Sequence, residues 1–98
     1  MNAGEVTVVA RIVALPESIE ALRSVLRSLI EPTRAEVECV SYAFFQDAER
    51  PTHFISIERW TSAAAAAAHM DTPHVKAALA AVGPLLAEPP EIRPYLPV

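Results

Sequence analysis

The segment Phe54-Ile55-Ser56-Ile57-Glu58-Arg59-Trp60 predicts a β-strand of alternating character that ends at the only tryptophan of the chain. Successive side chains of a strand point to opposite faces of its sheet, so the even-numbered residues share one face and the odd-numbered residues the other. The even-numbered face carries Glu58 beside Trp60 and Phe54, and His69 follows close behind in the sequence. A carboxylate, large aromatics and a nearby histidine are compatible with a pocket lining.

The remaining sequence predicts three more strands and two helical regions. Residues 6–13 are rich in β-branched side chains and predict an inner strand. Apolar residues recur at three- and four-residue steps between residues 19 and 30, which predicts an amphipathic helix, and Pro32 should interrupt it before one more turn at residues 33–36. The other two predicted strands lie at residues 39–46 and 91–96, the last at a sheet edge because of Pro94, and the opening strand spans residues 53–60. Further helices are predicted at residues 63–69, capped by Ser62, and from Pro73, capped by Thr72, bent at Gly83-Pro84 and ended by Glu88-Pro89-Pro90.

This β-α-β-β-α-β order predicts an α+β, ferredoxin-like fold with an antiparallel sheet and both helical regions on one face. The chain should form a single domain over residues 1–98, with its core between about residues 6 and 96. The opposite sheet face, with Ile55 and Ile57, would lie open to water in a monomer. A contiguous apolar face usually marks an interface, so we expect a homodimer.

The composition excludes several classes of protein. Of the 98 residues, 52% are hydrophobic and 20% charged, which indicates a folded domain rather than a disordered segment. The net charge is -4 and the basic residues form no stripe, so we expect no binding to nucleic acid. Cys39 is the only cysteine, so neither an intramolecular disulfide nor a thiolate metal cluster can form within one chain.

The sequence contains no predicted targeting or membrane segment. Its first five residues lack the basic and apolar regions of a signal peptide, and the longest alanine run, residues 63–68, is too short to cross a membrane. We therefore expect a cytoplasmic protein that does not bind membranes. The abundance of alanine and arginine indicates a GC-rich bacterial gene.

Glu58, Trp60 and His69 each have a structural interpretation beside a functional one. Trp60 could be a core residue or part of a pocket wall. Glu58 would need a partner under the helices, and Arg11 or Arg93 could form a structural salt bridge with it. His69 could cap its helix, pack in the core, or serve as a general base, because histidine titrates near neutral pH.

Tyr42 could pack in the core or orient a substrate oxygen, and the sequence does not decide which face it takes. Residues 63–68 could allow close helix packing or leave room for a flat ligand. We expect no metal site, because His69 and His74 are five residues apart and His53 belongs to another element. His74 is predicted to face solvent. With glycine only at positions 4 and 83, the chain also lacks a glycine-rich phosphate loop, so no nucleotide or flavin cofactor is expected.

Several of these residues together resemble the antibiotic biosynthesis monooxygenase family, over nearly the whole chain from about Val6. The resemblance rests on the order and spacing of five features rather than on one motif. They are Ile30-Glu31-Pro32-Thr33-Arg34-Ala35-Glu36, Cys39-Val40-Ser41-Tyr42, Glu58-Arg59-Trp60, His69, and Ala87-Glu88-Pro89-Pro90-Glu91-Ile92. The family usually has Pro-Gly before the second strand, where this chain has Val37-Glu38, so its turn must form without glycine.

The resemblance implies a dimeric α+β barrel and a cofactor-independent monooxygenase that oxidises a quinol or polycyclic phenol with O2. The substrate would lie in a cavity between sheet and helices. His69 would assist proton removal and Trp60 would pack on the rings, as the catalytic candidates. Tyr42, Phe54 and Glu58 are the candidates for substrate binding.

Relatives with other functions provide alternatives. One is a non-enzymatic ligand-binding or stress-related dimer. A second is haem degradation, but haem-degrading relatives carry an asparagine on the first strand, where residues 6–13 have none. A third is an isomerase acting on a small sugar-like signal molecule, which would need more polar pocket residues than the sequence offers.

Overall fold

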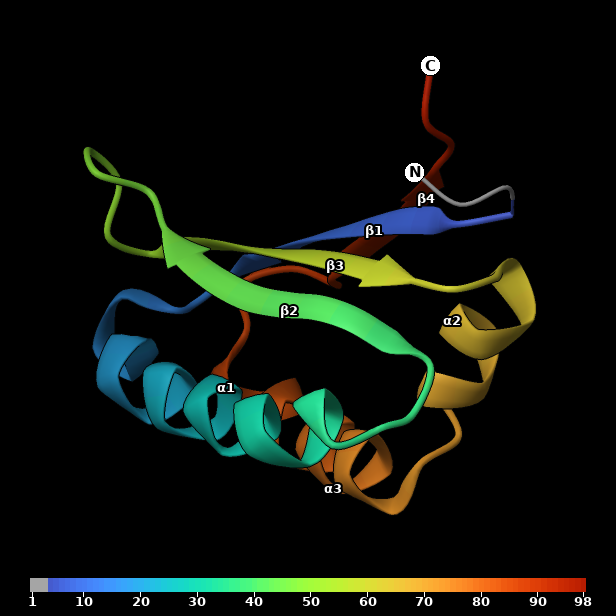
Figure 1. Ribbon diagram of the computed structural model, residues 1–98. Coiled ribbons are helices and arrows are strands. Elements are labelled where there is room, and N and C mark those ends of the chain that lie inside the picture. The colour runs from blue at the N-terminus through green and yellow to red at the C-terminus, as the bar shows by residue number, and fades with distance from the viewer. Residues whose placement is uncertain (1–3) are drawn as a thin grey trace.

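The computed structural model describes residues 4–98 and contains one four-stranded antiparallel sheet covered on one face by helices (Figure 1). In chain order the elements are β1 (Val6–Val13), η1 (Pro16–Ser18), α1 (Ile19–Arg34), β2 (Cys39–Gln46), β3 (His53–Trp60), α2 (Ala63–His69), α3 (Pro73–Val82), η2 (Gly83–Leu85) and β4 (Glu91–Tyr95). The predicted ferredoxin-like arrangement is therefore confirmed.

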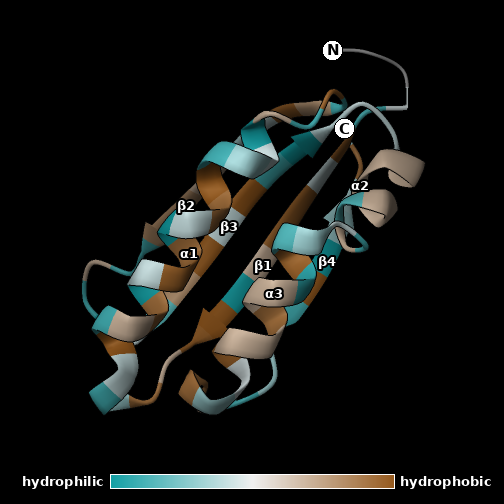
Figure 2. Cartoon of the chain, turned by 90° about the horizontal axis from the view of Figure 1, so that it is seen from below, coloured by the Kyte–Doolittle hydropathy of each residue, from teal (hydrophilic) through white to brown (hydrophobic). Residues whose placement is uncertain are grey.

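The strand order is β2-β3-β1-β4, and every neighbouring pair is antiparallel. β1 and β3 form the centre, as predicted for the first strand, and β4 is an edge strand that accommodates Pro94. α1 and α3 run beside each other across the sheet when viewed from the helix side (Figure 2). No helix of residues 4–98 is long and apolar enough to span a membrane.

The register of the strands settles which side chains lie under the helices. Tyr42 and Val8 both pair with Glu58, from opposite sides of β3, and cross-strand partners project from the same face of a sheet. All three are buried, so Tyr42 points toward the helices. A register shift between Cys39 and Ser41 lets β2 keep this alignment after its first residue.

Two helix boundaries differ from their prediction. α3 ends at Val82 and η2 at Leu85, before the predicted end at Glu88-Pro89-Pro90. α1 does not break at Pro32 but continues to Arg34, because Leu29 and Thr33 on either side of the proline are both buried against the rest of the chain. The Arg34 Nε also donates to the Tyr42 carbonyl oxygen at 3.0 Å. Tertiary packing therefore outweighs the loss of one helix hydrogen bond at the proline.

The two predicted helix caps behave differently. Ser62 caps α2 as expected, because its Oγ accepts from the Ala65 backbone N–H at 3.0 Å. Thr72 occupies the N-cap position of α3 without a side-chain cap bond. Its Oγ1 instead donates to the His69 carbonyl oxygen at 2.7 Å, so Thr72 ties the end of α2 to the start of α3.

The Ser62 cap yields a prediction about stability. Ser62→Ala should lower the free energy of unfolding by about 0.5–2 kcal/mol, because it removes a partner of an otherwise unpaired helix N–H group. Ser24→Ala, at an exposed position inside α1, is the matched control and should change stability by less than about 0.5 kcal/mol. Urea unfolding of both variants checks this, and equal effects would contradict the capping role.

Candidate functional site

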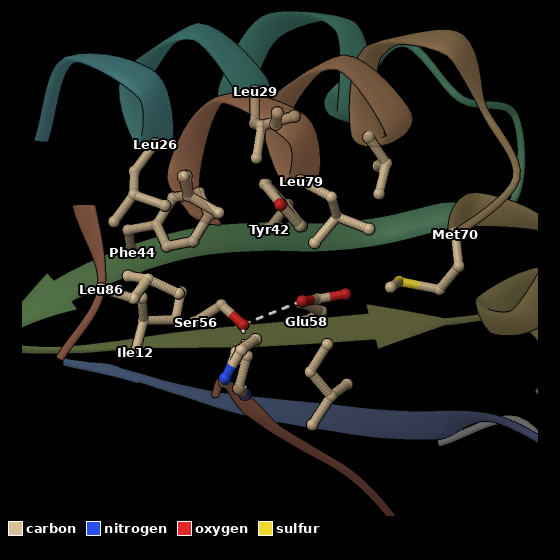
Figure 3. Close-up of a pocket in the computed structure, with 16 residues that line it drawn as sticks. Ile12, Leu26, Leu29, Tyr42, Phe44, Ser56, Glu58, Met70, Leu79 and Leu86 are labelled. Atoms are coloured by element: carbon tan, nitrogen blue, oxygen red, sulfur yellow. Dashed lines mark hydrogen bonds between the residues drawn. The ribbon is translucent and has the colours of Figure 1, made fainter. Parts of the chain in front are cut away.

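Glu58 lies at the centre of the helix-covered sheet face and is 6% exposed. Its Oε2 accepts from the Ser56 Oγ at 2.8 Å, and its Oε1 accepts from the Trp60 Nε1 at 3.0 Å. The Ser56 Oγ in turn accepts from the Ala10 backbone N–H at 3.2 Å. Ser56 and Trp60, both on β3, therefore hold the carboxylate in one orientation. Figure 3 shows the bond between Ser56 and Glu58.

The predicted arginine partner of Glu58 is wrong. Arg11 follows Ala10 on β1, and Ala10 faces the helices, so Arg11 points to the opposite face. Arg93 pairs with Val9 on that same outer face and contacts Glu91 at 3.1 Å. The period of the strands thus keeps both guanidinium groups away from Glu58, whose partners are a hydroxyl and an indole N–H.

A cavity of about 70 Å³, here called the main cavity, lies between the sheet and helices α1 and α3. Its walls are mostly aliphatic and aromatic, and Ser56, Glu58 and Tyr42 supply its polar side chains. Figure 3 shows Ser56 and Glu58 pointing from β3 toward the helices, with Met70 at one end. Leu79 and Ile92, which are each 42% exposed, lie where the cavity meets solvent.

A second cavity of about 250 Å³, here called the side cavity, lies under α2. Ala63, Ala66 and Ala67 contribute to its wall, so the alanine run leaves space beside the sheet. His69 lines this cavity as well. Glu58, Met70 and Ile92 line both cavities, which places the carboxylate where the two meet.

His69 is 3% exposed and is fixed on two sides. Its Nδ1 lies 2.7 Å from the Glu36 Oε2, and its ring centroid lies 4.6 Å from that of Trp60 at an interplanar angle of 37°. The Tyr42 ring meets it edge-on at 5.6 Å. The structure therefore brings together four of the predicted site residues: Tyr42, Glu58, Trp60 and His69.

Two of the predicted site residues lie outside the cavity walls. Trp60 is completely buried behind Glu58 and His69 and lines neither cavity. Phe54 packs in a separate part of the core with Leu22 and Leu26, and the Arg23 guanidinium lies 5.9 Å from its ring centroid. Phe54 lies on the same sheet face as Glu58, but it is four residues away along β3 and so lies apart from the carboxylate.

His74 does not face solvent, contrary to its prediction. Its side chain is 23% exposed, and its Nε2 lies 2.8 Å from the same Glu36 oxygen that contacts His69. Glu36, His69 and His74 form a compact group in which the possible ligand atoms all lie within 4.8 Å of one another. Sequence spacing could not reveal this group, because Glu36 precedes both histidines by more than 30 positions.

The turn after α1 places Glu36 in this group. It closes with a hydrogen bond of 3.0 Å from the Cys39 N–H to the Glu36 carbonyl oxygen. Val37 and Glu38 stand where the family usually has Pro-Gly, yet no residue of this turn has a positive φ. The turn therefore forms without glycine, as expected, and without a left-handed residue.

The environment of Tyr42 perturbs its ionisation. Burial raises the pKa of the Tyr42 phenol well above its ordinary value of 10.0, and the neighbouring Glu58 carboxylate raises this pKa further. Both effects disfavour the phenolate. Tyr42 therefore remains a hydrogen-bond donor beside the main cavity at neutral pH.

This pKa shift predicts loss of stability in alkali. Above about pH 10 a tyrosine of the unfolded chain ionises while the folded chain keeps the Tyr42 proton. The folded state then binds more protons, so its stability falls as the pH rises, by up to about 1.4 kcal/mol per pH unit. Tyr42→Phe should flatten this decline between pH 10 and 12 more than Tyr95→Phe does, as urea unfolding at each pH would show.

Comparison with known proteins agrees with the fold. The family model described as "Antibiotic biosynthesis monooxygenase" matches residues 5–81. A Mycobacterium tuberculosis protein named "Putative monooxygenase Rv0793" is 36% identical over 93 residues, which cover 95% of this chain and 91% of that protein. The Synechocystis protein sll1783 is 32% identical over 90 residues, and this chain spans 61% of its length.

Solved structures extend the similarity to three dimensions. The structure of Rv0793 superposes with a TM-score of 0.91 at 35% identity and covers 96% of this chain and 95% of its own. The structure of PA3566 from Pseudomonas aeruginosa gives a TM-score of 0.91 at 32% identity and covers 98% of this chain and 96% of its own. The chain therefore belongs to the antibiotic biosynthesis monooxygenase family.

Proposed function

We propose that the protein is a cofactor-independent monooxygenase that oxidises a small quinol with O2. The observation that supports this most is the Glu58 carboxylate, which is oriented by two donors and lines two largely apolar cavities. Membership of the monooxygenase family supports the same reaction class. Apolar walls suit an aromatic ring, and a single carboxylate suits a phenolic hydroxyl.

In the proposed reaction Glu58 accepts the proton of a substrate hydroxyl. A phenol ordinarily titrates near pH 10, so a positioned acceptor is needed to form the electron-rich phenolate at neutral pH. The phenolate then reduces O2, one oxygen atom forms a bond to a ring carbon and the other leaves as water. A quinol and O2 thus give a hydroxyquinone and water, and the quinol itself supplies all the electrons.

His69, which lines the side cavity but not the main cavity, is the second candidate for proton transfer. Its contact with Glu36 at Nδ1 fixes the ring orientation. Trp60 acts by positioning in this proposal, because it contacts Glu58 and His69 and is sealed from both cavities. In this proposal Trp60 packs against Glu58 and His69, the two groups that transfer protons, and not on the substrate rings as the resemblance implies.

The cavity volumes limit the substrate to a small ring system. Ligand pockets usually measure roughly 300–1,000 Å³, whereas the main cavity is about 70 Å³ and the side cavity about 250 Å³. Met70 lies between the two, and Leu79 stands half-exposed at the main opening. Rotation of these unbranched or partly exposed side chains would admit one aromatic ring beside Glu58 without separating the strands.

The proposal predicts O2 consumption by the purified protein with a quinol and no added flavin, nicotinamide or metal. Glu58→Gln should lower kcat about 10²–10⁴-fold, because it removes the proton acceptor. The amide can keep the Trp60 bond, and the Ser56 hydroxyl can turn to accept from it, so the variant should fold. Glu91→Gln, on the exposed edge strand, is the matched control and should keep the wild-type rate. An oxygen electrode and quinone absorbance measure both.

His69→Ala should lower the rate about tenfold or more if the imidazole transfers a proton. Circular dichroism must first show that each variant is folded. A folded Glu58→Gln protein with an unchanged rate would exclude Glu58 as the proton acceptor. Wild-type protein that binds quinols without oxidising them would favour the non-enzymatic ligand-binding alternative.

We also propose that two copies of the chain pack through their outer sheet faces, as the family resemblance implies. Ile57 and Phe45 project from that face and are 40% and 51% exposed. Arg59 borders it and is bound through two nitrogens to the buried Glu5 at 3.0 and 3.1 Å. Apolar side chains at the centre and bound charges at the border are typical of a protein interface.

Ile57→Lys should raise the dimer dissociation constant at least about tenfold, because it places a charge in an apolar contact. Ile57 lies on the face of β3 opposite Glu58, so the cavities should be preserved. Val37→Lys is the control, since Val37 is 94% exposed in the turn after α1. Light scattering at micromolar concentrations measures the dimer, and a wild-type protein that is monomeric there would contradict the proposal.

A further inference from the structure

We propose that Glu36, His69 and His74 form a binding site for a divalent transition-metal cation, with zinc as the best match. The inference shares His69 with the proposed oxidation reaction, but its test measures zinc binding and does not depend on that reaction. It rests on one carboxylate and two imidazoles that converge from three separate elements: the turn after α1, the end of α2 and the first turn of α3. We call this group the Glu-His-His cluster.

The distances in the cluster are near those of a metal site. The Glu36 Oε2 lies 2.7 Å from the His69 Nδ1 and 2.8 Å from the His74 Nε2, and all three atoms lie within 4.8 Å of one another. Zinc bonds of about 2.0–2.2 Å in a tetrahedron separate neighbouring ligand atoms by about 3.3 Å. The Glu36 oxygen therefore needs to move away from each nitrogen by about half an ångström. The two imidazole nitrogens, which are up to 4.8 Å apart, must approach each other by up to about 1.5 Å, through rotation of the partly exposed His74 side chain.

The three side chains of the cluster differ in exposure, and this difference allows the ligand atoms to move to the distances that zinc requires. The His69 ring is 3% exposed and held against Trp60, so it is a fixed ligand. The side chains of Glu36 and His74 are 19% and 23% exposed, so they can shift and an ion can enter from solvent. The same exposure leaves room for a water molecule as a fourth ligand.

The ligand set favours zinc over the alkaline-earth ions. Two imidazole nitrogens and one carboxylate oxygen form a known zinc ligand set, whereas calcium and magnesium prefer six or more oxygen ligands. Charge favours a cation as well. Among the ion pairs of residues 4–98, Glu36 contacts the two imidazoles and no lysine or arginine. A divalent ion would give the carboxylate a permanent positive partner.

Binding should also stabilise the fold. The ligands come from three elements that only the folded chain brings together, so the unfolded chain lacks the site. The Thr72 Oγ1 lies 3.3 Å from the His74 Nε2 and donates to the His69 carbonyl oxygen, which keeps the two histidines in register before an ion arrives. Zinc would therefore add a cross-link at the junction of α2 and α3.

The test is titration of untagged, EDTA-treated and dialysed protein with zinc chloride. We expect one ion per chain by isothermal calorimetry. At a hundredfold excess over the dissociation constant the melting temperature should rise by roughly 10 °C or more. Cobalt(II) should give the intense visible absorbance of a tetrahedral nitrogen–oxygen site.

His74→Ala is the main variant, because His74 is partly exposed and its loss should leave the fold intact. It should weaken zinc binding at least about tenfold and reduce the thermal shift, and Glu36→Gln should do the same. His53→Ala removes a histidine outside the cluster and should bind zinc like the wild type. No zinc-dependent thermal shift in the wild type, or equal zinc affinity in His74→Ala and His53→Ala, would overturn the proposal.

Discussion

The helix-covered face of this protein is organised around a buried carboxylate that has no cationic partner among residues 4–98. Removing a charged group from water costs several kcal/mol, whereas each hydrogen bond to such a group returns about 1.5–3 kcal/mol. Glu58 obtains two such bonds from Ser56 and Trp60, its neighbours two residues away on β3. The alternation of one strand therefore supplies the carboxylate, its two donors and their common direction, and the cavities form around them.

The sequence predicts the part of the structure that depends on local periodicity. Alternation along residues 53–60 places Ser56, Glu58 and Trp60 on one face, and the limits of β2, β3 and α2 agree with those predicted from the pattern. The order of elements then determines a ferredoxin-like sheet with few alternatives. The structure confirms these features because each is fixed by residues close together in the chain.

Features that depend on distant residues were not predictable in this way. The Arg11 and Arg93 partners were inferred from the need of a carboxylate for a cation, but strand period turns both to the outer face. Glu36 was not identified, because only the folded chain brings the turn after α1 to His69 and His74. Pro32 was expected to interrupt the helix before one more turn at residues 33–36, but α1 runs through it without a break to Arg34, because burial of the flanking residues overrides that local preference.

Met70 separates the two cavities beside Glu58, and this position has a consequence for the timescale of binding. Methionine is unbranched and has several rotatable bonds, so its conformers differ little in energy. Changes between side-chain conformers take picoseconds to nanoseconds at accessible positions, whereas motions of whole helices take microseconds or longer. The space beside Glu58 can therefore lengthen or shorten through torsions of a single thioether, and the rate of ligand capture need not depend on opening of the fold.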